Sequence, residues 1–165
     1  MTHYPIIFSL VKACGYKSYL ELGVWEGQLL ASVAKITRTA IGVDINDVRR
    51  DKSTALFIGT TKEFFVNNNL LFDFIFIDAD HRLEAVTEDF VSCIKILNEG
   101  GVIAIHDTDP ASKDLLIDGY CSNSYLLLDR LNRDHLSFIT LPVGSEGLTL
   151  ISRSRDRRIN RVLGP

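Results

Sequence analysis

Short apolar segments alternate with amphipathic ones along the first two thirds of the chain. The apolar segments are rich in β-branched and aromatic residues, as strands are, and they cover residues 18–22, 40–44, 54–58, 74–78 and 102–106. Between them, apolar residues recur at spacings of three and four, which predicts helices over 28–37, 60–68 and 82–97. Strands that alternate with helices indicate a parallel sheet with helices on both faces.

Two local signals mark the ends of these helices. Thr60 and Glu63 have the spacing of a capping box, in which each side chain bonds the backbone N–H of the other residue. Gly100 and Gly101 follow the helix at 82–97, and we expect the chain to turn back there into the next strand.

The pattern changes after residue 106. A segment of about fifteen residues, 107–121, separates the fifth strand from a short helix expected over 122–133, and loops of this length are commonly functional or mobile. Two further strands, 136–141 and 148–152, are joined by only six residues, which suits an antiparallel hairpin and is too short for a crossover helix. The expected fold class is therefore α/β: doubly wound, with a mostly parallel seven-stranded sheet that ends in a C-terminal antiparallel hairpin.

Length and composition place the chain among ordinary globular domains. With 165 residues, of which 46% are hydrophobic and 24% charged, it can bury one core, and we expect one domain over residues 1–152. No apolar run reaches the roughly 18 residues of a membrane span, and the amino-terminal residues do not resemble a secretory signal. The three cysteines form no CxxC pair, which argues against a disulfide framework or a zinc site built on cysteines. These features favour a cytoplasmic protein.

Charge is unevenly distributed along the chain. The net charge is −3, yet the tail at residues 153–165 carries five arginines and one aspartate, so the rest of the chain carries about −7. An acidic body does not attract a polyanion, which disfavours nucleic acid as a partner. The basic tail is either simply solvated or touches phosphate or an acidic partner.

A turn that contains glycines follows the first strand, where residues 21–27 read ELGVWEG. Glycine at such a turn lets the backbone approach a ligand, and the helix that follows offers free N–H groups. Asp44 ends the second strand, 21 residues after Gly23, where a carboxylate can accept hydrogen bonds from both ribose hydroxyls of an adenosine cofactor. Alternatively, the glycines only permit a tight turn and Asp44 only begins a loop. The order of strand, glycine turn, helix, strand and acid favours the cofactor site.

These segments resemble the class I S-adenosylmethionine-dependent methyltransferases. Within that family the chain is most similar to the small O-methyltransferases akin to the catechol and caffeoyl-CoA enzymes and to the sugar O-methyltransferases of antibiotic pathways. The resemblance extends over about residues 17–152. It implies a Rossmann-like methyltransferase fold, S-adenosylmethionine as the cofactor and a small-molecule hydroxyl as the methyl acceptor.

The resemblance assigns cofactor roles to residues after the first two strands. It places Glu21 near the amino group of the methionine moiety, Gly23 and Gly27 in the turn, and Asp44 on the ribose. Trp25 stands where the family usually has a middle glycine, so its contact with the cofactor departs from the family pattern.

The turn after the third strand, 59–61, is expected against the adenine. Relatives often have Asp-Ser or Asp-Ala in this turn, whereas this chain has Thr60 and Thr61. The aspartate that contacts adenine is therefore missing, and we expect a threonine hydroxyl to do part of its work.

The segment FIDADH, residues 76–81, is the most specific match to these O-methyltransferases. In the family its first aspartate, here Asp78, lies beside the methyl group and can ligate a divalent cation. The second metal element of the family is Asp-Asn, whereas this chain has His106 and Asp107. Asp78, His106 and Asp107 are thus the candidate catalytic residues and could hold magnesium, manganese, iron or zinc. If no cation binds, His106 is the candidate general base, held or polarised by Asp107.

Two residues of the same segment are candidates for binding the acceptor. Asp80 is expected to bind substrate or, alternatively, to fix the loop as a turn carboxylate. His81 is expected to orient the substrate, with a surface position at the start of the helix over 82–97 as the alternative.

The sequence therefore predicts an S-adenosylmethionine-dependent methyltransferase that acts on a small-molecule hydroxyl. The first alternative is a non-catalytic cofactor-binding or regulatory domain of the same fold, because the segment before the first strand is short for a substrate cover. A nicotinamide-dependent oxidoreductase is less favoured, since G-x-G-x-x-G is absent. The open pocket would be completed by residues 107–121 or by a second subunit, so a homodimer is one expectation.

Overall fold

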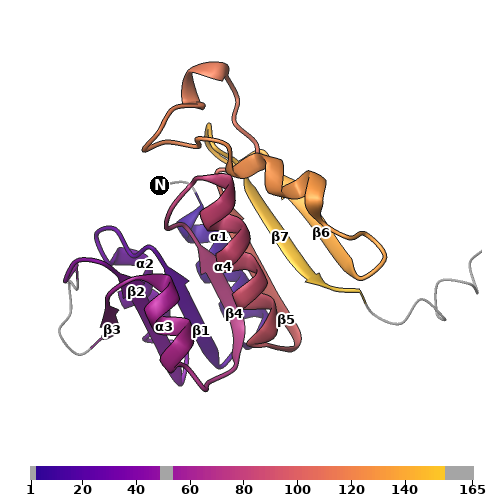
Figure 1. Ribbon diagram of the computed structural model, residues 1–165. Coiled ribbons are helices and arrows are strands. Elements are labelled where there is room, and N and C mark those ends of the chain that lie inside the picture. The colour runs from indigo at the N-terminus through magenta and orange to yellow at the C-terminus, as the bar shows by residue number, and fades with distance from the viewer. Residues whose placement is uncertain (1–2, 49–53, 155–165) are drawn as a thin grey trace, which may run out of the picture.

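The computed structural model describes residues 3–48 and 54–154. A seven-stranded sheet runs through the molecule in the order β3-β2-β1-β4-β5-β7-β6 (Figure 1). The first five strands are parallel, whereas β7 is antiparallel to both β5 and β6. The predicted α/β sheet with its C-terminal antiparallel hairpin is confirmed. The strands are β1 Ser18–Leu22, β2 Thr39–Asp44, β3 Ala55–Ile58, β4 Phe72–Ile77, β5 Leu97–His106, β6 Leu136–Leu141 and β7 Leu148–Arg153.

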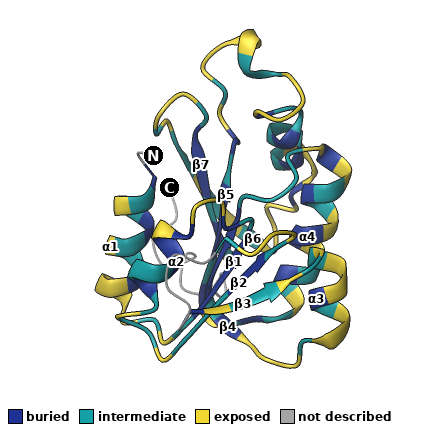
Figure 2. Ribbon diagram, turned by 90° about the vertical axis from the view of Figure 1, so that its left-hand side faces the viewer, coloured by how far each residue is buried: buried dark blue, intermediate teal, exposed yellow. Residues whose placement is uncertain are grey.

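Helices cover both faces of the sheet, with α1 and α2 on one face and α3 and α4 on the other (Figure 2). The longest, α4, has 13 residues, whereas a membrane span needs about 20. No helix in the described parts of the chain is long and apolar enough to cross a membrane. The helices are α1 Tyr4–Cys14, α2 Gln28–Val33, α3 Thr61–Asn67 and α4 Leu83–Lys95, and the 3-10 helices are η1 Lys113–Leu115 and η2 Ser124–Arg130.

Two apolar cores form because both faces of the sheet are covered. Leu20 and Leu22 of β1 belong to the core beneath α4, whereas Tyr19 belongs to the core beneath α1 and α2. Successive side chains of a strand point to opposite faces, so Glu21 shares the α1 face with Tyr19. An acidic side chain is therefore buried among apolar neighbours at the end of β1.

Helix α2 is shorter than the pattern of apolar residues predicts. It ends at Val33, and the N–H groups of Lys35 and Ile36 bond carbonyls three residues back rather than four. This tighter bonding is typical of a helix that closes into a turn.

The start of β5 also differs from the prediction. Gly100 and Gly101 lie inside this strand rather than in a turn before it, since α4 ends at Lys95 and β5 begins at Leu97. Leu97 pairs with Phe72, and the register then shifts. Residues 98–101 thus lie opposite Asp73 alone, an irregularity that the sequence pattern of a helix followed by glycines does not distinguish from a turn.

The predicted capping box is present at the start of α3. Thr60 Oγ1 accepts a hydrogen bond from Glu63 N at 3.2 Å, and Glu63 Oε2 accepts one from Thr60 N at 2.8 Å. At the other end of the chain, the first residue of the expected tail, Arg153, is the last residue of β7 and donates a hydrogen bond to Leu97 O at 3.1 Å. The rest of that tail, 155–165, lies outside the described residues.

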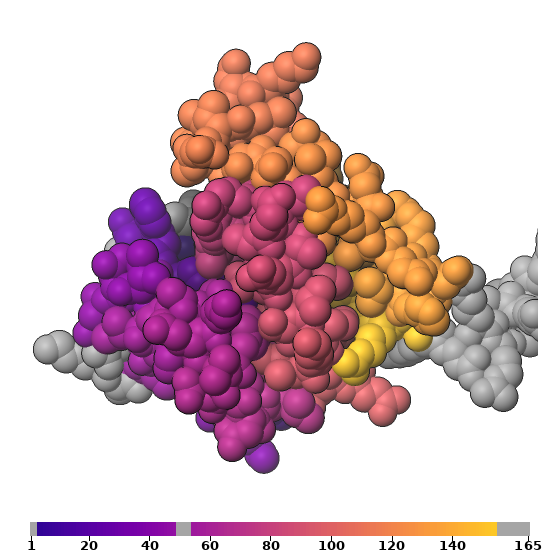
Figure 3. Space-filling model, viewed as in Figure 1, coloured from indigo at the N-terminus to yellow at the C-terminus, as the bar shows by residue number. Residues whose placement is uncertain are grey.

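The segment between β5 and η2 stands above the carboxyl ends of the strands (Figure 1) and projects from the rest of the surface (Figure 3). Its two ends are buried, at Asp107 and Thr108 and again at Cys121 and Ser124, while the middle is mostly exposed. This segment therefore rises from the edge of the sheet where β1 and β4 also end. The strand order reverses between β1 and β4, and ligands of such sheets bind in the crevice at this point.

Candidate active site

The turn after β1 and the residue after β4 meet at the switch point. Asp78 N donates a 2.8 Å hydrogen bond to Leu22 O, and Gly23 N donates a 2.9 Å hydrogen bond to Val43 O. A Cβ atom on Gly23 would lie 2.2 Å from the carbonyl oxygen of Asp78, and the residue has φ +81°. Glycine is thus required at position 23 because the backbone of Asp78 lies so close to it. A substitution would disturb Asp78 as well as a ligand.

The rest of the glycine turn is exposed. Trp25 has φ 53° and its side chain is 64% exposed, so the indole is available to a ligand and is not part of the core. Gly27, with φ 73°, is the N-cap residue just before α2. The turn places both residues at the carboxyl end of β1, where the resemblance expects the cofactor.

Glu21 is 1% exposed, and its Oε2 accepts a 2.6 Å hydrogen bond from the hydroxyl of Tyr19. Burial raises the pKa of Glu21 well above its ordinary value, although the hydrogen bond from Tyr19 lowers it. Burial therefore favours the neutral form of this carboxyl group. A cationic group placed beside it would favour ionisation, which suits the amino group that the resemblance assigns to this position.

Asp44 holds the loops around the turn. Its Oδ2 accepts a 3.0 Å hydrogen bond from Val24 N, and its Oδ1 accepts a 2.9 Å hydrogen bond from Asn46 N. Each carboxylate oxygen can accept a second hydrogen bond. Asp44 can therefore serve the backbone and a pair of ribose hydroxyls at once.

The two threonines expected at the adenine already have partners. The hydroxyl of Thr60 donates a 2.8 Å hydrogen bond to Glu63 in the capping box, and the side chain of Thr61 hydrogen-bonds Asp89. Each hydroxyl keeps a free acceptor lone pair, so either could accept a hydrogen bond from the adenine amino group, whereas donating to adenine would require it to exchange its present partner.

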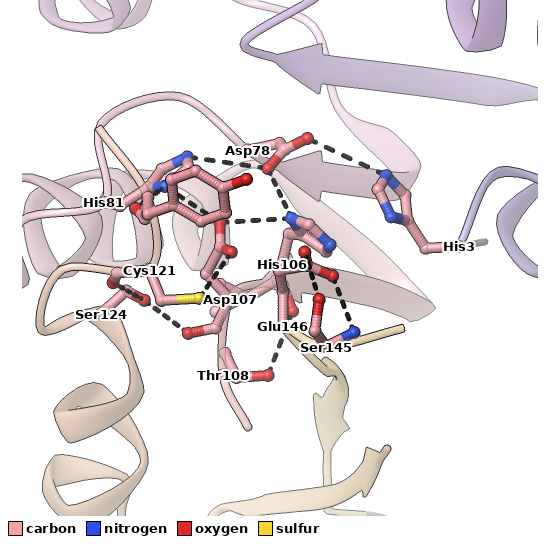
Figure 4. A network of polar contacts seen from close by, with 12 residues as sticks. His3, Asp78, His81, His106, Asp107, Thr108, Cys121, Ser124, Ser145 and Glu146 are labelled. Atoms are coloured by element: carbon pink, nitrogen blue, oxygen red, sulfur yellow. Dashed lines mark hydrogen bonds and ion pairs between the residues drawn. The ribbon is translucent and has the colours of Figure 1, made fainter. Parts of the chain in front are cut away.

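The structure brings Asp78, His106 and Asp107 together at the ends of β4 and β5 (Figure 4). His106 Nδ1 lies 3.0 Å from Asp78 Oδ1 and 3.2 Å from Asp107 Oδ2. Asp107 is 2% exposed and has φ 59°. Residues other than glycine rarely adopt this backbone conformation. Strained residues of this kind cluster at functional sites.

The charges of these three groups depend on one another. Burial lowers the pKa of His106, but its hydrogen bonds to Asp107 and Asp78 outweigh burial and raise the pKa to about 10. Burial raises the pKa of Asp107, and the neighbouring histidines outweigh it, so the net shift is downward. Burial dominates at Asp78 and raises its pKa. In this arrangement His106 keeps its proton at neutral pH, which disfavours it as a general base.

Of the two candidate substrate residues, His81 joins this cluster and Asp80 does not. His81 Nδ1 lies 3.0 Å from Asp107 Oδ2, and its Nε2 lies 3.8 Å from Asp78 Oδ1. The carboxylate of Asp80 accepts a 3.0 Å hydrogen bond from Arg82 N and pairs with the Arg82 guanidinium. Asp80 is thus the turn carboxylate at the start of α4, and His81 faces the site rather than solvent.

Sequence reasoning missed three residues of the site. Cys121 Sγ donates to Asp107 Oδ1 at 3.1 Å, and Ser124 Oγ donates to the carbonyl oxygen of Asp107 at 2.6 Å. His3 Nε2 lies 4.0 Å from Asp78 Oδ2. The unusual length of the segment before Cys121 was the one available signal for the first two, and no sequence pattern links His3 to Asp78.

The donor atoms of this cluster fit a divalent cation. Ligand atoms of His3, Asp78 and His106 lie within 4.8 Å of one another, and so do those of Asp78, His81 and Asp107. Within residues 3–48 and 54–154, two buried imidazole nitrogens of this cluster lack a hydrogen-bond partner, His3 Nε2 and His106 Nε2. Buried polar atoms normally have partners, and a cation can supply them.

A cavity of about 380 Å³ lies at the segment that follows Asp107, and Thr108 is its lining residue nearest to the cluster in the sequence. It is lined by residues 108–113 together with Leu116 and Tyr125. A volume of this size suits a small molecule.

Comparisons with known proteins agree on the fold. A family model described as a methyltransferase domain matches residues 20–108, more than half of the chain. No curated protein matches the sequence.

Three solved structures illustrate the structural similarity. The O-methyltransferase TomG from Streptomyces achromogenes, involved in tomaymycin synthesis and solved with S-adenosylmethionine, has 16% identity and a TM-score of 0.69, over 93% of this chain and 80% of that one. An O-methyltransferase from Bacillus cereus with S-adenosylhomocysteine has 19% identity and a TM-score of 0.68, over 93% and 81%. The S-adenosylhomocysteine-bound methyltransferase PaMTH1 from Podospora anserina has 16% identity and a TM-score of 0.72, over 93% and 78%. At these identities the similarity shows the fold, and the predicted Rossmann-like methyltransferase fold is confirmed.

Proposed function

The chain belongs to the methyltransferase domain family, and we propose that it transfers the methyl group of S-adenosylmethionine to a hydroxyl group of a small molecule. The observation that carries this proposal is the cluster of Asp78, His106 and Asp107 beside the glycine turn at the switch point of the sheet. A cofactor site and a set of acid, base or metal-binding groups thus lie next to each other.

The glycine turn would hold the cofactor. Glu21 would meet the amino group of its methionine moiety, Asp44 its ribose and the turn at Thr60 and Thr61 its adenine. Gly23, Trp25 and Gly27 form the turn between the first two of these contacts. The bound S-adenosylmethionine and S-adenosylhomocysteine of the TomG and Bacillus cereus structures support this choice of cofactor.

Methyl transfer requires little covalent chemistry from the protein. The sulfonium methyl is already electrophilic, so the site must align an acceptor oxygen behind it and favour loss of the hydroxyl proton. Asp78, which follows β4 directly beside Gly23, would position the acceptor at the cofactor.

A divalent cation fits the same cluster and would be held by Asp78, His106 and Asp107. When bound, such a cation lowers the pKa of an acceptor hydroxyl. Cys121 and Ser124 fix the carboxylate and the carbonyl group of Asp107, and His81 would orient the acceptor from the same side as Asp107.

The acceptor would occupy the cavity at residues 108–113. Because this segment is exposed in its middle and anchored at Cys121, it can cover a bound molecule without disturbing the sheet. A homodimer and a cytoplasmic location stay predictions of the sequence.

Two measurements test the proposal. Calorimetry measures the binding of S-adenosylhomocysteine, and an activity assay then measures the formation of S-adenosylhomocysteine from S-adenosylmethionine. We expect binding and turnover with a panel of catechols and sugar hydroxyls. Binding without turnover on any hydroxyl acceptor would favour the non-catalytic alternative, and absence of binding would refute the proposed cofactor.

A further inference from the structure

His3 is the residue before α1, and its imidazole lies in the candidate active site (Figure 4). The ring is 3% exposed, and its centroid lies 4.0 Å from that of His106 and 5.5 Å from that of Phe76. Tyr4 packs edge-on against it, with 4.8 Å between ring centroids. These rings fix the imidazole, so its position does not depend on a hydrogen bond.

The Nε2 atom of His3 has no structural task in the fold. It lies 4.0 Å from Asp78 Oδ2, which is beyond hydrogen-bond distance. It is buried, and no group in the described part of the chain forms a hydrogen bond with it. A buried nitrogen that faces a carboxylate without bonding it indicates a missing partner.

The distances fit a cation as that partner. Ligand atoms around one ion lie about 3 to 4 Å apart, because each bond to the ion is about 2.0–2.2 Å long. His106 Nδ1 and Asp78 Oδ1 are 3.0 Å apart, and the ligand atoms of His3, Asp78 and His106 all lie within 4.8 Å. Small side-chain movements would bring all three onto one ion.

We infer that His3 is a further ligand, beside Asp78 and His106, of one divalent transition-metal ion that accepts imidazole ligands, such as zinc, and not magnesium. Magnesium takes oxygen ligands, whereas imidazole suits zinc, iron and nickel. The inference rests on the proposed function only because both concern the same site. It makes His3, the residue before α1, a part of that site.

The distribution of histidines supports a nitrogen-rich site. The chain has four histidines, and three of them, His3, His81 and His106, contact Asp78 at 3.0–4.0 Å. The fourth, His135, is exposed in the turn before β6, which makes it a matched control.

Metal titration of the full chain, freed of metal with a chelator, tests the inference. We expect Zn²⁺ to bind, and an equal concentration of Mg²⁺ not to displace it. His3→Gln should weaken Zn²⁺ binding by about 100-fold or more, because loss of an outer partner of a ligand alone weakens binding by about 10–100-fold. His135→Gln should bind Zn²⁺ like the wild type.

Nitrogen-15 spectra of the wild-type histidines make the test independent of how the variant folds. Zn²⁺ should shift the ring resonances of His3 and His106 and leave those of His135 in place. An unshifted His3, displacement of Zn²⁺ by equimolar Mg²⁺, or normal Zn²⁺ affinity in His3→Gln would overturn the inference. S-adenosylhomocysteine affinity is measured in the same samples without metal, and its absence in the wild type would refute the proposed function instead.

Discussion

Tyr19 donates a 2.6 Å hydrogen bond to Glu21 on the face of β1 that α1 covers. Both side chains are buried, and burial raises the pKa of each well above its ordinary value. A carboxyl group whose neutral form is favoured by burial thus lies at the end of β1, next to the turn where the cofactor is proposed to bind. It can gain a negative charge when a cationic amino group binds.

We expect Glu21→Gln to fold like the wild type and to bind S-adenosylhomocysteine roughly ten- to hundredfold more weakly. Glutamine keeps the shape of the neutral carboxyl group but cannot ionise toward the ligand, and hydrogen bonds to charged groups contribute about 1.5–3 kcal/mol. In the wild type, binding should release a proton from Glu21. The calorimetric enthalpy should therefore depend on the buffer for the wild type and not for the variant, and a buffer-independent wild-type enthalpy would contradict the charged pairing.

Asp44→Ala should lower the affinity for S-adenosylhomocysteine roughly ten- to hundredfold, because it removes charge-assisted hydrogen bonds of about 1.5–3 kcal/mol to the ribose. Calorimetry on the folded variant measures this. Asp47→Ala, at an exposed position of the same loop, is the control and should bind normally. Unchanged affinity in Asp44→Ala would remove the ribose assignment.

Gly23→Ala should destabilise the protein more than Gly15→Ala does. Both glycines have positive φ, but a Cβ atom at Gly15 would meet no atom within 4 Å, whereas one at Gly23 would meet the backbone of Asp78. We expect about 1–2 kcal/mol of backbone strain at either position and about 1–3 kcal/mol more from overpacking at Gly23. Urea denaturation compares the two variants. Equal losses in the free energy of unfolding would show that the backbone at Asp78 moves away from the new Cβ atom without cost.

A divalent cation at about 100 times its dissociation constant should raise the free energy of unfolding by about 2.7 kcal/mol, because it binds only the folded state. Asp78→Ala should remove this gain, and Asp129→Ala, at an exposed position of η2, should retain it. Chelation should also stop methyl transfer. Transfer that survives both chelation and His106→Ala would show that neither a cation nor His106 activates the acceptor.

Asp89 makes stability depend on pH in a predictable direction. It is 5% exposed, and burial raises its pKa from 3.8 to about 6, although the hydrogen bond from Thr61 lowers it. The native state therefore binds more protons than the unfolded state between about pH 4 and 6, so stability falls as pH rises through this window. The full effect, reached above about pH 6, is at most about 3 kcal/mol.

Asp89→Asn should accordingly be more stable than the wild type at pH 7 and similar to it near pH 4. Chemical denaturation at both pH values gives the free energy of unfolding of the variant and of the wild type. Groups other than Asp89 titrate alike in both proteins, so their contribution cancels from the difference. Glu88→Gln, at an exposed neighbouring position, should show a much smaller change, because the charge of Glu88 is the smallest of the causes that raise the pKa of Asp89. A variant that gains no stability at pH 7 would mean that the carboxylate of Asp89 is solvated in the folded state.

The chain order of strands and helices was enough to predict where the candidate site lies. Parallel strands bring their carboxyl ends to one edge of the sheet, so Asp78 and His106 were expected to be neighbours although 28 residues separate them. The sequence also predicted the capping box at Thr60 and the hairpin formed by β6 and β7, because each depends on residues close in sequence.

The sequence by itself thus determined the sheet, the glycine turn and the acids at the strand ends, all of which follow from local periodicity and strand direction. Only the tertiary structure decided that His3 lies beside Asp78, that Cys121 holds Asp107 and that the register of β5 shifts at residues 98–101. It also decided the protonation of His106, since its pKa is the balance of burial against two carboxylates. Such contacts depend on how distant segments pack against one another, and no local pattern of residues specifies that packing.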